Sequence, residues 1–367
     1  MLSTQSVPRY TCRDIHAGID TSGHLRRVIS CDIACKAHHS PSPPTIERTA
    51  RSMQSAVTDR SEKPILLLIN LHSRQGLERF GEVVAAFNSL GVRYIIGQVM
   101  RSEDFSHCIR WHQEQVSAVV IGGGDGTVNL AIDALLETNL PLGLLPLGTA
   151  NDLARTLELP LEVAEACSVV AGGHRQSIDL GKVNGKYFFN VASCGLSIKI
   201  TDALSKDLKQ RWGILAYAIA AVKALLTLRR FDAEIQIDGE QIIHRHTLQI
   251  AVGNGRFYGG GLTVAKDAAI DDQRLDLYSL EVPHWWQLFF VLPALKSGRG
   301  NSRFGIHRWQ GKTFELRTRS HKRLNTDGEV TTRTPAVFEL CPAALNVFVP
   351  APTPTADALP ANASAPS

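Results

Sequence analysis

The chain has 367 residues, 44% of them hydrophobic, which fits two globular domains with tails. Its formal net charge is only +4 and no dense basic stripe is present, which argues against nucleic-acid binding. No stretch is a convincing membrane span, because the best one, residues 212–228, contains Lys223 and falls short of the roughly 20 apolar residues required.

The first 61 residues are mixed, polar and without hydrophobic periodicity. They contain the segment HHSPSPP at residues 38–44, so residues 1–61 are predicted to carry no packed structure. Structured sequence begins soon after Met53, which suggests an alternative start at that residue.

Residues 62–155 alternate short apolar runs with helical patterns. The predicted strands are 65–69, 94–99, 118–121 and 143–146, and the predicted helices are 77–90, 105–115 and 128–136. This alternation predicts an α/β nucleotide-binding domain built on a parallel sheet that helices cover. Ligands bind at the carboxyl ends of the strands in such sheets.

Strand-like pieces dominate after about residue 160. They are 175–183, 186–192, 233–237, 241–252, 274–280, 313–318 and 330–334. Asn184-Gly185 and Asp238-Gly239 are hairpin turn signals, and one long helix is predicted at 206–228. We therefore predict a mostly antiparallel, β-rich second domain at 156–335, a last strand at 336–349 that returns to the first domain, and a disordered tail at 350–367.

A glycine-rich turn at residues 122–127 (GGGDGT) follows the strand 118–121 and precedes a helix. Glycines let a phosphate approach the main chain, and a helix start offers it unpaired N–H groups. A bare carboxylate would repel phosphates, so Asp125 is expected to act through a divalent cation. The turn therefore favours phosphoryl transfer over dinucleotide redox chemistry, and its alternative is an ordinary Asp-Gly turn.

A second polar cluster, PLGTANDLAR at residues 146–155, follows the strand 143–146. It offers a glycine turn, a hydroxyl, an amide and a second carboxylate. Its alternative role is helix capping, in which Asn151 or Asp152 caps a helix at 153–157. The two roles are compatible.

Three further motifs complete an ordered set: SIDLG at 177–181, FNVASCG at 189–195 and LNTDGE at 324–329. The five motifs together resemble the diacylglycerol kinase catalytic domain family, in particular its soluble bacterial-type lipid kinases, over about residues 62–349. The resemblance implies an α/β domain plus a C-terminal β-sandwich, of the NAD kinase/diacylglycerol kinase-like type, with the active site between them. It also implies ATP- and Mg²⁺-dependent phosphorylation of a lipid hydroxyl.

The resemblance also implies roles for individual residues. The nucleotide phosphates and their surroundings would be held by Gly123, Gly124, Asp125, Gly126, Thr127, Thr149 and Asn151. The acidic network around the catalytic magnesium would comprise Asp125, Asp152 and Asp179. Asp327 matches the carboxylate that takes the proton from the lipid hydroxyl, with Glu329 beside it. Without the other motifs, a turn aspartate in Asp327-Gly328 would be the favoured interpretation.

Two positions depart from the family pattern. The first strand of the family usually ends in Asn-Pro-x-Ser-Gly, whereas residues 70–74 read NLHSR. Asn70 and Ser73 are still predicted to contact the nucleotide. The missing Pro and Gly leave the shape of their loop undetermined. The family's Asp-Asp-Gly, which is associated with a structural magnesium site, is Asp-Asp-Gln at 271–273. Asp272 is predicted as a metal ligand, with a solvated loop as the alternative.

Membrane contact is suggested by the aromatic run HWWQLFFVL at 284–292. Amphipathic rings beside cations suit a membrane surface. The following cations are Lys296, Arg299 and Arg303, and those bracketing the long helix are Lys206, Lys209, Arg211, Arg229 and Arg230. The alternatives are a helix packed onto the sheet and cations that solvate helix ends.

Two other functions remain open: an NAD kinase-like enzyme, which shares the GGDGT turn, and a non-catalytic lipid-binding protein on the same fold. The four aspartates argue against lost catalysis, and GTAND with DGE favours the lipid branch. The seven cysteines are odd in number and form no CxxC pair, so reduced thiols and a cytoplasmic location, peripheral at the membrane, are predicted. The lipid and the oligomeric state, including a homodimer, are open.

Overall fold

The computed structural model separates into two compact units, Met1–Ser61 and Glu62–Ser367. The described residues are 18–19, 25–26, 63–71, 73–198, 229–258, 262–263, 268–282, 287 and 305–352. The predicted helix at 206–228, and the run at 284–292 apart from Gln287, lie outside them. In the first unit, β1 (Gly18–Ile19) pairs antiparallel with β2 (Leu25–Arg26). No helix within the described ranges is long and apolar enough to cross a membrane.

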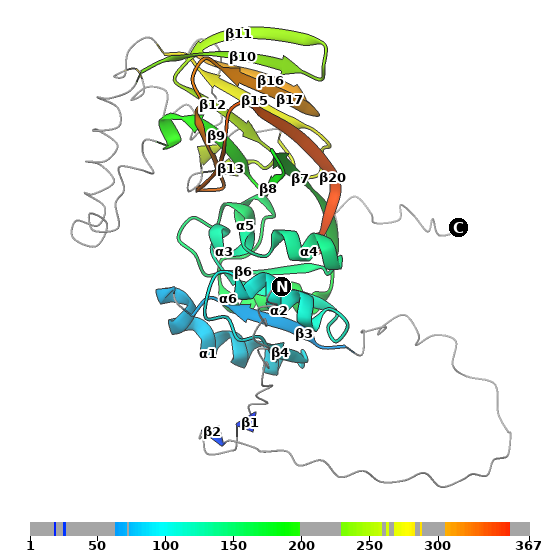
Figure 1. The fold of residues 1–367 in the computed structure, drawn as a ribbon. Helices are drawn as coiled ribbons and strands as arrows, with labels where there is room; N and C mark the ends of the chain where they lie inside the picture. The colour runs from blue at the N-terminus through cyan, green and yellow to red at the C-terminus, as the bar shows by residue number, and fades with distance from the viewer. Residues whose placement is uncertain are drawn as a thin grey trace, which may run out of the picture. The chain divides into compact units, whose positions relative to one another are not determined.

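The second unit begins with a parallel sheet in the order β4-β3-β5-β6. Its strands are β3 (Ile65–Ile69), β4 (Tyr94–Ile96), β5 (Ala118–Gly123) and β6 (Leu142–Pro146). Figure 1 labels β3, β4 and β6 of this sheet. The helices are α1 (Arg74–Ser89), α2 (Asp104–His112), α3 (Asp125–Asn129), α4 (Ile132–Thr138), α5 (Asp152–Thr156) and α6 (Val163–Gly172). All residues of β3, β5 and β6 are buried, because helices cover both faces.

The structure differs from the predicted helices in two places. The helix predicted at 128–136 is two helices, α3 and α4, and Ser106 on α2 donates a hydrogen bond to the Leu130 carbonyl between them. α6 was not predicted, because strand-like residues were expected to dominate after residue 160. It packs against α1 and β6, so tertiary contact stabilises a helix in which the valines obscured the pattern.

The β-rich part consists of two sheets. Its strands are β7 (Arg175–Val183), β8 (Lys186–Phe188), β9 (Val191–Gly195), β10 (Phe231–Ile237), β11 (Gln241–Thr247), β12 (Gln249–Gly253), β15 (Leu275–Leu280), β16 (Ile306–Gly311), β17 (Thr313–Thr318), β18 (Arg323–Thr326), β19 (Glu329–Arg333) and β20 (Ala336–Phe348), with a small hairpin of β13 (Phe257–Tyr258) and β14 (Leu262–Thr263). Six antiparallel strands form one sheet in the order β16-β15-β12-β9-β18-β19. The predicted fold class, a parallel-sheet α/β part followed by an antiparallel β-rich part, is confirmed.

Strand β20 connects the two parts of this unit (Figure 1). It pairs parallel with β6 at Val347↔Leu142 and antiparallel with both β7 and β17. The order β11-β10-β17-β20-β6-β5-β3-β4 therefore continues from antiparallel into parallel strands within one ten-stranded sheet.

Two predicted strands are each divided. The strand predicted at 241–252 is β11 in the ten-stranded sheet and β12 in the six-stranded sheet. The buried Thr247 hydroxyl donates to the carbonyls of Gln249 and Leu280 at this change of sheet. The strand predicted at 186–192 is interrupted between β8 and β9 at Phe189 and Asn190, whose N–H groups bind a side chain described below.

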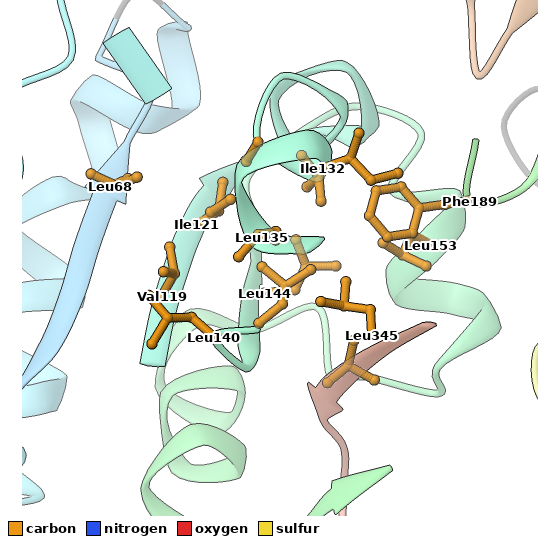
Figure 2. Close-up of a cluster of buried hydrophobic side chains, with 14 of the residues drawn as sticks. Leu68, Val119, Ile121, Ile132, Leu135, Leu140, Leu144, Leu153, Phe189 and Leu345 are labelled. Carbon is orange, nitrogen blue, oxygen red and sulfur yellow. The ribbon is translucent and has the colours of Figure 1, made fainter. Parts of the chain in front are cut away.

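Apolar side chains fill three main layers. Leu66 and Leu68 on β3 face one cluster and Leu67 faces another, because successive strand residues point to opposite faces. Figure 2 shows the first cluster, where strand residues such as Ile121 meet Leu135 from α4. The third cluster lies between the two β-sheets.

A substitution at Phe338 on β20 tests the packing of the third cluster. Its side chain is fully buried, so Phe338→Ala is expected to lower the free energy of unfolding by about 3–5 kcal/mol, because a cavity remains. Val337 is its neighbour on the opposite face and is 43% exposed, so Val337→Ala should cost less than about 1 kcal/mol. Urea denaturation of both variants is the measurement. Equal losses would contradict this assignment of faces.

Candidate active site

The two glycine-rich loops touch through their backbones. β5 and β6 are adjacent and parallel, with Gly123 opposite Pro146, so their carboxyl ends lie side by side. A Cβ atom added to Gly148 would lie 2.3 Å from the Cα atom of Gly124, closer than real Cβ contacts allow. Glycine is therefore needed at residue 148 for the loops to approach this closely.

Asp125 joins the two loops by hydrogen bonds. One carboxylate oxygen accepts from the Asp152 N–H at 3.1 Å and the other from the Leu153 N–H at 2.9 Å. These N–H groups begin α5, so Asp125 caps that helix from another loop. The prediction that Asn151 or Asp152 caps it was wrong for Asn151, which stands at the N-cap position without a side-chain cap bond. Asp125 and Asp152 are thus brought together.

Asn151 shapes its own loop. Its amide donates to the Gly148 carbonyl at 2.9 Å and accepts from the Gly148 N–H at 2.9 Å, while its backbone has a left-handed φ of 52°. Asn tolerates that conformation better than most residues. The side chain is buried, whereas Thr149 is exposed. A ligand at this loop would meet Thr149 before Asn151.

The loop after β3 approaches the same edge. The Asn70 amide donates to the Thr127 hydroxyl at 3.1 Å, and the Ser73 hydroxyl accepts from Gly76 N–H at 3.0 Å to cap α1. A Cβ on Gly76 would lie 2.1 Å from the Asn70 carbonyl oxygen. Gly76 thus allows the loop to fold tightly without a glycine at residue 74. It was missed in the sequence, where its only signal is a glycine two positions later than the family pattern.

Among the described residues, Asp179 shares no hydrogen-bond partner with Asp125 or Asp152. It is 2% exposed, and its oxygens accept from the N–H groups of Gln273 and Ala343, both at 2.7 Å. The carboxylate therefore holds a loop and the bulge of β20 in place.

Asp272 is engaged within its own loop. Its carboxylate pairs with the Arg274 guanidinium at 3.1 Å. Within the described ranges, no three His, Cys, Asp or Glu side chains converge as a metal site. Metal binding by Asp125, Asp152, Asp179 and Asp272 stays a prediction.

Asp327 and Glu329 come from the hairpin β18–β19. The Asp327 carboxylate accepts from the N–H groups of Phe189, Asn190 and Val191 at 2.7, 3.0 and 2.9 Å. The Asn129 side chain on α3 also lies close enough to it to favour its charged form. Glu329 is exposed, and its Oε1 lies 3.9 Å from the position of a Cβ on Gly126. The hairpin thus places the Glu329 carboxylate beside the GGGDGT turn and the Asp327 carboxylate near α3, which follows that turn.

Burial raises the pKa of Asp327 to about 6, against hydrogen bonds from the three N–H groups and Asn129 that favour the charged form. The residue keeps some exposed surface, but its carboxylate points inward to those donors. Asn129 was not predicted from the sequence. Its Oδ1 atom is buried without a hydrogen-bond partner.

Apolar packing fixes the donors of Asp327. Phe189 is 2% exposed and belongs to the same cluster as Leu153, and Figure 2 shows their side chains next to each other. Leu153 donates its N–H to Asp125, and Phe189 donates its N–H to Asp327. One apolar contact therefore links the Asp125 loop with the residues that orient Asp327.

Gly148→Ala tests the contact between the loops. The added methyl should force them apart and lower the free energy of unfolding by about 1–3 kcal/mol, as overpacking does. Gly172, at the end of α6, has nothing within 4 Å of an added Cβ, so Gly172→Ala should be neutral or slightly stabilising. Thermal unfolding of both variants is the measurement. An unchanged Gly148→Ala protein would show that the loops are not in contact.

The titration of Asp327 is a second test. Its carboxyl ¹³C shift is expected to titrate near pH 6, and Asn129→Ala should raise that midpoint because a donor to the charged form is lost. A folded-state pKa above the ordinary 3.8 means that the native state binds more protons, so this group makes the fold less stable as the pH rises from about 4 to about 6. A midpoint below 4 would show that the hydrogen bonds outweigh burial.

Comparison with known proteins bears on the whole second unit. Residues 64–183 match the diacylglycerol kinase catalytic domain, and residues 190–349 match the YegS C-terminal NAD kinase beta sandwich-like domain. A probable lipid kinase YegS-like protein of Pseudomonas aeruginosa is 33% identical over 300 residues, which cover 78% of this chain and 95% of that protein. A diacylglycerol kinase of Staphylococcus saprophyticus is 28% identical over 240 residues, which cover 65% of this chain and 78% of that protein.

The fold has a counterpart among solved structures. The crystal structure of a putative diacylglycerol kinase from Bacillus anthracis superposes with a TM-score of 0.69 at 24% identity, covering 81% of this chain and 98% of that one. The resemblance predicted from the five sequence motifs is thereby confirmed. The chain belongs to the diacylglycerol kinase catalytic domain family and is an enzyme of the kinase type.

Proposed function

We propose that this protein transfers the γ-phosphoryl group of ATP to a lipid hydroxyl, with diacylglycerol or a related lipid as acceptor and Mg²⁺ as cofactor. The observation that carries the proposal is the position of the β18–β19 hairpin, whose Glu329 lies beside Gly126 of the GGGDGT turn. A phosphate-binding loop faced by carboxylates is what phosphoryl transfer to a hydroxyl requires. The acceptor class follows the names of the relatives.

The loops fit the phosphates of a nucleotide. Gly126 has open space around it, since the nearest atom to an added Cβ is Glu329 Oε1 at 3.9 Å. A phosphate can therefore approach the main chain there. Thr127 and Asn70, which hydrogen-bond to each other, stand at the same edge and hold the turn to the loop after β3.

Asp125 and Asp152 fit Mg²⁺ better than Asp179 does. Magnesium is commonly held by one or two carboxylates together with substrate phosphates, so a site of three protein ligands is not needed. Asp125 and Asp152 are adjacent at the start of α5, and the main-chain hydrogen bonds that Asp125 accepts there, at 3.1 and 2.9 Å, are longer than the two bonds of 2.7 Å that Asp179 accepts. When bound, Mg²⁺ would neutralise charge on the phosphates.

The proton of the acceptor hydroxyl needs a carboxylate to receive it. Asp327 is the proposed general base that receives this proton. Three N–H groups fix its orientation, and its raised pKa suits proton transfer near neutral pH. Glu329 is exposed beside the turn and is the second candidate. The three N–H donors to Asp327 also occupy its lone pairs, so the two carboxylates must be tested separately.

The decisive assay supplies radiolabelled ATP, Mg²⁺ and a panel of lipids in detergent micelles, and then separates the organic phase. Label in a lipid product is expected and would name the acceptor. Label in NADP after NAD is added would instead favour an NAD kinase-like enzyme. Absence of any transfer by a protein that binds ATP would favour the non-catalytic lipid-binding alternative.

The two carboxylates are distinguished by the pH profile of activity. A base must be ionised, so kcat/KM of the wild type should fall as the pH drops through about 6. Asp327→Asn should lower kcat by at least about 100-fold with nucleotide affinity retained, whereas Glu329→Gln should keep the pH profile. A larger loss in Glu329→Gln than in Asp327→Asn would transfer the role to Glu329.

A further inference from the structure

Two histidines stand on the exposed face of β11, and the proposed function uses neither of them. His244 and His246 are two positions apart, so their side chains point to the same side of the strand. Arg245 between them points to the other side, where its guanidinium lies 4.7 Å from the centre of the Trp309 ring. The two imidazoles are 75% and 57% exposed, so ions in solution can reach both.

The histidines are remote from the glycine-rich loops. β11 is the outermost strand of the ten-stranded sheet, and β10, β17 and β20 lie between it and β6. Neighbouring strands are about 4.8 Å apart, so four steps across the sheet separate β11 from β6 by roughly 19 Å. Any ligand of these histidines is therefore distinct from a nucleotide bound at the loops.

A carboxylate on the neighbouring strand faces each imidazole. In the register of β10 and β11, Asp232 lies opposite His246 and Glu234 lies opposite His244. The Nδ1 atom of His246 is 2.7 Å from Asp232 Oδ1, and the Nδ1 atom of His244 is 3.9 Å from Glu234 Oε2. Both rings therefore turn the same nitrogen toward the acids of β10.

The hydrogen bond with Asp232 decides which nitrogen of His246 carries the proton. An ionised carboxylate only accepts hydrogen bonds, so Nδ1 is the donor, and Nε2 of the neutral ring keeps its lone pair. Histidines that bind metals show this arrangement: one nitrogen binds the ion, while the other donates to a carboxylate that orients the ring and raises its basicity. His244 has the same orientation at a longer distance from its carboxylate.

The spacing of the two histidines suits one shared ion. Residues on the same face of a strand are about 6.8 Å apart. An ion that binds two imidazoles at about 2.1 Å needs their nitrogens about 3.4 Å apart, so each ring has to lean by less than about 2 Å. Both residues line an open hollow of about 780 Å³ on this face, so water can complete the coordination.

The charges around the pair permit a cation. Arg317 and Arg319 line the same hollow, and the Arg317 guanidinium donates to Glu315 at 3.3 Å. These two arginines are balanced by three carboxylates, those of Asp232, Glu234 and Glu315, which gives a formal charge of 2 − 3 = −1 with neutral imidazoles. The face therefore carries no net positive charge that would repel a metal ion.

We propose that His244 and His246 bind a divalent transition-metal ion of the zinc, copper or nickel class, and that Asp232 and Glu234 orient the two imidazoles. Imidazole nitrogen suits these ions, whereas Mg²⁺ prefers oxygen ligands. The site is thus chemically distinct from the proposed magnesium site at the start of α5 and does not depend on the proposed function. It consists of two protein ligands and water, so it is smaller than the three-residue groups that are absent from the described ranges.

The test is calorimetric titration of the full chain with ZnCl₂ in the presence of excess MgCl₂. The variant is His244→Gln with His246→Gln, which removes both ligand nitrogens at exposed positions and should leave the fold intact. His107→Gln with His174→Gln is the matched control, because it removes two exposed histidines from other elements. A third variant, Asp232→Asn, keeps the size of the side chain but removes its charge.

Wild type and control are expected to bind zinc equally, and the His244→Gln, His246→Gln variant should lose that zinc. Asp232→Asn should bind it about 10-fold more weakly, because loss of a partner of a metal-binding histidine typically costs that much or more. Cysteine thiols also bind zinc, so the result is the difference between the variants. Equal binding by variant and wild type, an equal loss in the control, displacement by Mg²⁺, or full affinity in Asp232→Asn would each overturn the inference.

A spectroscopic measurement on the wild type does not depend on the folding of any variant. In ¹H–¹³C spectra, zinc should shift the Cε1–H signals of His244 and His246 more than those of His107 and His174. Equal shifts, or none, would overturn the site.

A kinase assay separates this inference from the proposed function. The His244→Gln, His246→Gln variant should turn over as fast as wild type with Mg²⁺, because the histidines are remote from the glycine-rich loops. Loss of turnover in this variant would overturn the separation of the two sites. Zinc binding by a protein that transfers no phosphoryl group would support this inference and reject only the proposed function.

Discussion

The close backbone contact between Gly124 and Gly148 is the constraint on which the site depends. It brings the carboxyl ends of β5 and β6 together without any intervening side chain. Only at this separation can the Asp125 carboxylate reach the N–H groups that begin α5. A single carboxylate thereby satisfies two N–H donors at the start of a helix and fixes the second loop relative to the first. Because the loops are already fixed, they lose no conformational freedom when a ligand binds.

Apolar packing connects the two glycine-rich loops with the β-rich part. α5 presents Leu153 to Phe189, and the main chain around Phe189 supplies the donors that hold Asp327. Asn129 adds a polar link from α3 to the same carboxylate. Because these contacts share residues, a change in one loop is expected to alter the orientation of Asp327, and energetic effects of substitutions here should not be additive.

Strand β20 gives the unit its continuity, since on one side it pairs first with β17 and then with β6, while β7 pairs along its other side. Asp179 reinforces this junction by accepting from the Ala343 N–H at the bulge of β20 and from Gln273 in a neighbouring loop. A buried carboxylate with two such donors stabilises local structure even if it never binds metal. The family motif that contains Asp179 therefore has a structural explanation here that does not depend on catalysis.

The sequence by itself determined the parallel strands, the glycine turns, the β-rich second part and the family, because burial periodicity and turn conformation are properties of neighbouring residues. It predicted the Asp125 turn and one helix at 128–136, but the division of that helix into α3 and α4, the helix α6 and the divisions of the strands at residues 189–190 and 248 required tertiary contacts. Only the tertiary structure decided that Asp125 caps α5 from 27 residues away and that Phe189 orients Asp327 from 138 residues away. Such partners are chosen by packing of distant segments, which no local pattern records.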